Sequence, residues 1–189
     1  MSVDLEATVP EPVRLDVLVA AAERLLAGLL ALSSRPEVVV FGGRRYQQGR
    51  RVGEGRRLSR PELVAQVVGP HSPGRSDGAF EFEVLGGEIA WAWMSVMDDG
   101  EPGEPTYVLF SPSRTCGGVV LATALALAVA ECAGGEFRDE EIGMLVPPET
   151  DPARVVEVTR LTDPAFDFGD ACERYLRQFP QLGGWPSRA

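Results

Sequence analysis

The sequence contains no lysine, so its 18 lysine-or-arginine residues are all arginine, and it has only one histidine, His71. Together with abundant alanine, glycine and proline, this bias indicates a GC-rich bacterial source. A single histidine excludes zinc sites built from several histidines and disfavours a Ser-His-Asp triad. His71 lies between Pro70 and Ser72, where we expect an exposed loop. The sequence therefore favours a protein that is not an enzyme, and it predicts neither a bound metal nor a cofactor.

Cysteine is also scarce, with three residues at Cys116, Cys132 and Cys172. We expect Cys116 and Cys132 at opposite ends of one helix, where a rise of about 1.5 Å per residue separates them by roughly 24 Å. That separation is far beyond disulfide reach. An odd number of cysteines without a close pair is typical of a reducing compartment. No basic segment followed by an apolar run begins the sequence, so we predict a cytoplasmic protein.

The longest apolar run, residues 117–133, is Ala-rich and contains Glu131. A membrane span needs about 20 strongly apolar residues, so this run predicts a buried core helix and no membrane contact. Gly134 and Gly135 follow it and are typical of a helix C-cap.

Residues 79–97 have the pattern of a β-hairpin, with apolar residues alternating around Gly86-Gly87. A two-residue turn there pairs Leu85 with Glu88. This register predicts that Phe82 lies opposite Trp91 and that Phe80 lies opposite Trp93. We therefore expect one face to be wholly large and apolar and to pack against the apolar helix, with an aromatic binding surface as the alternative.

These elements predict an α+β fold, in which an antiparallel sheet of about four to six strands packs against two long helices at 12–33 and 117–133. Further strands are expected at 37–41, 106–111 and 154–161, and an amphipathic helix at 170–179. The predicted organisation is a flexible arm at 1–11, a single domain at 12–180 with an Arg-rich loop at 44–60, and a tail at 181–189.

The net charge of −10 is unevenly distributed, because residues 44–60 contain seven arginines and one glutamate, a local charge of +6. The rest of the chain therefore carries −16. Such acidity disfavours nucleic acid, and only Tyr46 accompanies the arginines as a stacking residue. For both the arginine cluster and the acidic residues, the alternative to contact with a partner is that they lie in solvated loops. The candidate partner-binding residues are Arg44, Arg45, Arg50, Arg51, Arg56, Arg57, Asp98, Asp99, Glu101, Glu104, Asp139, Glu140 and Glu141.

The segment 111–118 joins a predicted strand to the apolar helix and is a candidate anion or ligand site. Free N–H groups and the helix dipole attract anions at such a position, although the Gly-Lys-Ser/Thr ending of a phosphate loop is absent. Helix packing and capping, or a thiol of lowered pKa at the helix start, are the alternatives. The candidate residues are Ser113, Arg114, Thr115, Cys116 and Gly117.

Three functional hypotheses follow from this sequence. The first is a non-enzymatic, acidic protein-binding module, such as a bacterial immunity- or antitoxin-like inhibitor of a basic partner, which would associate fast by electrostatic steering. The second is a small-molecule or anion-binding domain, or a small enzyme, that uses the loop 111–118. The third is a structural protein that forms homo-oligomers through its Arg-rich loop.

Overall fold

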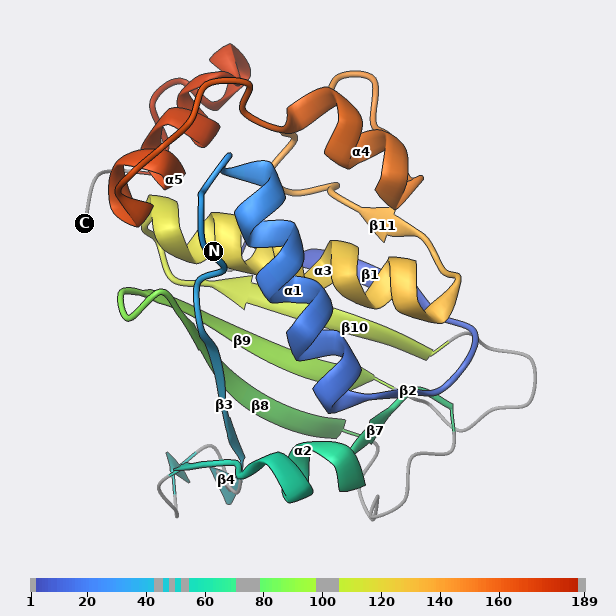
Figure 1. The fold of residues 1–189 in the computed structure, drawn as a ribbon. Coiled ribbons are helices and arrows are strands. Elements are labelled where there is room, and N and C mark those ends of the chain that lie inside the picture. The colour runs from blue at the N-terminus through green and yellow to red at the C-terminus, as the bar shows by residue number, and fades with distance from the viewer. Residues whose placement is uncertain are drawn as a thin grey trace.

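A computed structural model describes residues 3–42, 46–47, 50–51, 55–70, 79–97 and 106–186. The fold is α+β, as predicted (Figure 1). The described residues form one seven-stranded antiparallel sheet, in the order β11-β1-β10-β9-β8-β3-β6, together with the small pairs β2-β7 and β4-β5. The sequence predicted about four to six strands, so the main sheet has one strand more than the upper end of that range.

The strands of the main sheet are β1 (Leu5–Val9), β3 (Val38–Gly42), β6 (Arg56–Arg57), β8 (Ala79–Gly86), β9 (Ala90–Met97), β10 (Thr106–Pro112) and β11 (Phe137–Arg138). The small pairs consist of β2 (Val13–Arg14), β7 (Val67–Val68), β4 (Tyr46–Gln47) and β5 (Arg50–Arg51). The helices are α1 (Leu15–Leu29), α2 (Arg60–Ala65), α3 (Cys116–Ala133), α4 (Pro152–Thr159), α5 (Phe168–Arg177) and the short 3₁₀ helix η1 (Pro180–Leu182).

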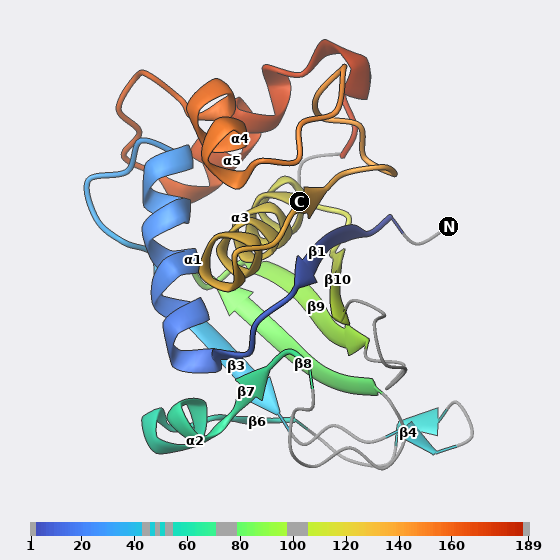
Figure 2. The ribbon, with the colours of Figure 1, turned by 90° about the vertical axis from the view of Figure 1, so that its right-hand side faces the viewer.

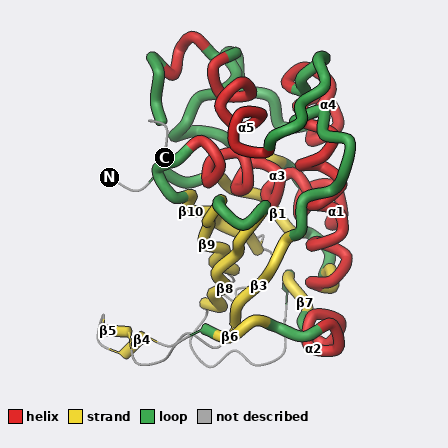
Figure 3. The backbone as a smooth tube through the Cα atoms, turned by 60° about the vertical axis from the view of Figure 1, so that its left-hand side comes forward, coloured by secondary structure: helices red, strands yellow, loops and turns green. Residues whose placement is uncertain are grey.

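Helix α3 is the centre of the core. It packs on β1, β9 and β10, and its other sides meet α1, α4 and α5 (Figure 2). Figure 3 shows these four helices on one side of the strands. Because every side of α3 has a partner, the helix needs no polar face.

One helix of the described residues, α3, is long and apolar enough to cross a membrane, but 89% of its apolar window is buried inside the protein. This burial confirms the predicted core helix and fits a soluble protein. The helix ends as expected at Gly134, whose φ of 66° lies in the left-handed region. A residue without a Cβ adopts that conformation at little cost.

The predicted register of the hairpin is wrong. Gly86 pairs with Ala90, which leaves a three-residue turn and places Leu85 opposite Trp91. Because side chains alternate along a strand, this change of register moves the tryptophans of β9 to the other face. Ala90 takes the place under α3, where a Cβ added to Gly117 would approach the Ala90 Cβ to 3.1 Å. Only small side chains fit between the helix start and the sheet at this close approach.

Three other predictions are corrected at the edges of the fold. Residues 5–9 are not a flexible arm but the strand β1, which pairs with both β10 and β11. Residues 154–159 belong to helix α4, because Asp151 caps it by accepting the Ala153 N–H and Pro152 suits its first turn. Of the predicted tail at 181–189, the described residues 181–186 are no free tail, since they complete η1 and form a segment that Arg177 holds by hydrogen bonds.

Candidate functional site on the open face of the sheet

The face of β3, β8 and β9 that points away from α3 is covered by no helix of the described part of the chain, and we call it the open face. Strand pairing arranges its side chains in rows. One row joins Val39, Leu85 and Trp91. The next joins Phe41, Glu83, Trp93 and Ser111. Within a row, neighbouring strands are about 4.8 Å apart.

These two rows form an aromatic platform, defined by Phe41, Leu85, Trp91 and Trp93. The Phe41 and Trp91 rings lie side by side, with centroids 5.9 Å apart and planes tilted by 31°. Trp91 is 38% exposed, and the other three side chains are half-buried. A protein surface that leaves neighbouring aromatic rings in contact with water is typical of a binding site.

Glu83 lies within this platform, between Phe41 and Trp93 in its row. Its side chain is half-buried, whereas Glu81, two residues earlier on the same face of β8, is exposed. A carboxylate held among aromatic rings is screened by water less than one at the surface. The platform therefore combines apolar area with one acidic side chain.

A cavity of about 380 Å³ opens beside the platform, and we call it the tryptophan cavity. All three tryptophans of the chain line it, two from β9 and Trp185 from the C-terminal segment. Its size is within the range of about 300–1,000 Å³ that is usual for ligand pockets. Its other lining residues are Val3, Glu83, Ala92, Ser111, Pro112, Ser113 and Arg114.

Trp185 reaches the cavity because Arg177 of α5 fixes the segment around it. The Arg177 guanidinium donates hydrogen bonds to the Gly184 carbonyl at 2.8 Å and to the Pro186 carbonyl at 2.9 Å. The Trp185 backbone N–H donates to the Leu182 carbonyl at 2.9 Å. These bonds hold the end of the described chain to α5, and from there Trp185 lines the cavity beside the open face.

A second hollow, of about 520 Å³, adjoins the other side of the platform and shares Phe41 and Leu85 with it, and Val39 lines it as well. Phe166 lines this hollow and is 97% exposed, and Arg57 and Glu37 form an ion pair there. The exposed apolar surface therefore extends beyond the tryptophans to Phe166.

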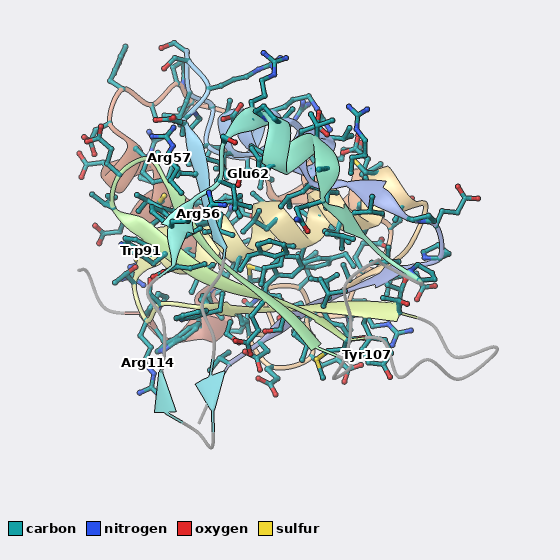
Figure 4. The ribbon with its side chains drawn as sticks, turned by 90° about the horizontal axis from the view of Figure 1, so that it is seen from below. Arg56, Arg57, Glu62, Trp91, Tyr107 and Arg114 are labelled. Atoms are coloured by element: carbon teal, nitrogen blue, oxygen red, sulfur yellow. The ribbon has the colours of Figure 1, made fainter. Side chains whose placement is uncertain are left out.

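The structure divides the candidate residues of the strand-to-helix loop between two places. Ser113 and Arg114 line the tryptophan cavity. Figure 4 shows Trp91 and Arg114 toward one end of the sheet, with Tyr107 toward the other. The Ser113 N–H donates to the Trp91 carbonyl at 2.9 Å, which extends the strand pairing up to the loop.

The second half of this loop begins helix α3. Thr115 caps the helix, its Oγ1 accepting the Gly118 N–H at 3.1 Å. A hollow of about 200 Å³ lies beside this helix start. Its carboxylates disfavour an anion there. The residues lining it are Ile89, Thr115, Cys116, Gly117, Asp167, Gly169, Asp170 and Glu173.

Two residues of the candidate Arg-rich surface have described side chains, and both form ion pairs. Arg56 pairs with Glu62 and Arg57 pairs with Glu37. The Arg56 guanidinium is the main cause that holds the pKa of Glu62 well below its usual range, and the backbone N–H of Ser59 lowers it further. Outside the described side chains lie Arg44, Arg45, Arg50, Arg51, Asp98, Asp99, Glu101 and Glu104.

The acidic candidates at 139–141 separate into different roles. Asp139 accepts three backbone N–H groups, from Ile142, Gly143 and Met144, at 2.7–3.0 Å, and it thereby fixes a turn. Burial raises the pKa of the Asp139 carboxyl, and these three bonds oppose the rise. Glu141 accepts the Asp4 N–H at 2.7 Å, while Glu140 is exposed.

Sequence reasoning singled out the tryptophans of the open face but assigned them to the core, with an aromatic binding surface only as the alternative. The signal was the presence of all three tryptophans in an otherwise aromatic-poor chain, but the assumed turn length assigned Trp91 and Trp93 to the core. Within the described residues, no cluster of three or more His, Cys, Asp or Glu side chains has metal-binding geometry. Comparison with protein-family models, curated protein sequences and solved structures gave no match.

Proposed function

We propose that this chain is a protein-binding module that docks a basic partner on the open face of its sheet. The observation that carries the proposal is the aromatic platform around Glu83. Protein interfaces are enriched in tryptophan, tyrosine and phenylalanine, and tryptophan dominates their energetically important positions. A carboxylate inside such a platform favours a positively charged group on the partner.

The net charge of −10 supports a basic partner. An acidic protein attracts a basic one over long distances and thereby increases the association rate, an effect that falls as salt is added. The biological role that we propose is that of an immunity- or antitoxin-like inhibitor in the bacterial cytoplasm, where blocking a surface of a basic protein requires no catalytic group.

A two-stage experiment tests this function. The tagged protein is recovered from its native host at low salt, and each co-purifying protein is identified and produced in pure form. Binding is then measured with the wild type, with Trp91→Ala and with Tyr107→Ala. Tyr107 is the matched control, because it is an aromatic residue of the same open face but lies toward the other end of the sheet (Figure 4).

We expect a basic protein that binds the wild type and the Tyr107→Ala variant alike. Binding to the Trp91→Ala variant should be weaker by at least tenfold, the size of effect that marks an important interface residue. The affinity should also fall with salt. Equal binding of all three proteins, or the absence of any direct basic partner, would refute the proposal.

A further inference from the structure

We infer that the tryptophan cavity is a binding site for a guanidinium or ammonium group. This inference deepens the proposed function by naming the chemical group that the partner presents, and it rests on that function for the source of the cation. The site itself is defined by residues from four parts of the chain: Val3 before β1, the β8–β9 hairpin, the end of β10 with the loop after it, and the C-terminal segment.

The aromatic walls of the cavity favour a cation. Trp91 and Trp93 project from the same face of β9, two residues and therefore about 7 Å apart along the strand. Trp185 adds a third indole from a distant part of the sequence. The face of an indole attracts a positive charge within about 6 Å of the ring centroid, and tryptophan is the strongest of the aromatic side chains in this respect.

Glu83 gives the site its charge preference. It lies directly opposite Trp93 on the neighbouring strand, at the strand spacing of about 4.8 Å. A cation stacked on Trp93 is therefore within reach of the Glu83 carboxylate. A charge-assisted hydrogen bond to a carboxylate is roughly twice as strong as one between neutral groups. A planar guanidinium, which can stack and donate at once, fits this arrangement particularly well.

Arg114 also lines the cavity, from the loop that follows β10. It lies three residues beyond Ser111, and Ser111 is two strands, or roughly 10 Å, from Glu83, so the backbone of Arg114 is further than that from Glu83. Arg114 is exposed. A cation stacked on Trp93 therefore lies nearer to the backbone of Glu83 than to that of Arg114.

The three tryptophans give a direct measurement, because each contributes one indole N–H signal to a ¹H–¹⁵N NMR spectrum and all three line the cavity. The probe is N-acetyl-arginine amide, which carries the guanidinium without a carboxylate or a free amine. The matched neutral probe is N-acetyl-citrulline amide, which keeps the shape but lacks the charge. Sodium acetate serves as the anionic probe.

We expect the arginine probe to shift the indole signals saturably, and the citrulline probe to bind about tenfold more weakly. The Glu83→Gln variant should lose about tenfold in affinity for the arginine probe, whereas Glu81→Gln should bind as the wild type does. Glu81 is the matched control because it lies on the same face of β8, outside the cavity. The unchanged remainder of the spectrum shows that each variant is folded.

Equal binding of the arginine and citrulline probes, an unchanged affinity in Glu83→Gln, or a larger response to acetate would overturn the inference. Two further probes distinguish the sources of the cation. Tighter binding of an arginine-containing basic peptide than of agmatine supports a partner side chain, and the reverse supports a free small cation; either result supports the site. If no probe binds but a basic protein still requires Trp91, the inference fails while the proposed function stands.

Discussion

Replacing Met94 with alanine tests the register of the β8–β9 hairpin, on which the open face depends. Met94 is 1% exposed and lies opposite Phe82, on the face that α3 covers. The same strand offers a matched control in Met97, which is half-buried on the open face. The two substitutions remove the same atoms from one strand, so their comparison isolates the face on which each side chain lies.

The expected costs differ because only one substitution creates a buried cavity. Shortening a fully buried methionine to alanine costs about 2–5 kcal/mol, through lost burial and the space left behind. At a half-exposed position, where neighbouring side chains and water fill the space, we expect about 1 kcal/mol or less. With a urea m-value of about 2 kcal/mol per M, the unfolding midpoint falls by about 1–2.5 M in Met94→Ala and by about 0.5 M or less in Met97→Ala.

Urea unfolding followed by tryptophan fluorescence measures both midpoints. An equal loss in the two variants, or a larger loss in Met97→Ala, would refute the register. The side chains of β9 that pack under α3 would then be those assigned to the open face, and Trp91 and Trp93 would belong to the core.

Two further predictions concern carboxylates with shifted pKa values. Asp139→Asn should destabilise the fold by about 1–3 kcal/mol, because the NH₂ group of the new amide faces a backbone N–H whose hydrogen bond the carboxylate accepted. Thermal unfolding measures this loss of stability. An equal loss of stability in the Glu140→Gln variant would contradict the prediction. The pKa of Glu62 is lower in the folded protein than in the unfolded chain. The contacts of Glu62 therefore stabilise α2 fully at pH values above the usual pKa range of glutamate, and this stabilisation is lost as the pH falls through the folded pKa. An NMR titration of the Glu62 carboxyl should therefore show a higher midpoint in Arg56→Gln than in the wild type, and an unchanged one in Arg57→Gln.

The candidate site could be predicted from the sequence only in part. The sequence singled out Ser113, Arg114 and the tryptophans as notable, and it placed the strand that ends near 111. It could not bring Trp185 to β9, because that contact depends on how α5 and Arg177 lie against the start of α3. Contacts between distant segments leave no periodic pattern, and no local rule of helix or strand formation contains them.

Residue type and spacing alone determined the α+β class and the core helix of this protein. The run 117–133 is apolar on all sides, so it had to be surrounded by other elements, and the turn residues around it separated the strands. Only the tertiary structure decided which face of β9 is buried. A turn of three residues instead of two reverses every side chain of the strand, and the alternation of alanine and tryptophan fits either choice. The close approach of α3 at Gly117 decides which face is buried. Ala90 is small enough to fit under the helix, and Trp91 and Trp93 therefore lie on the open face.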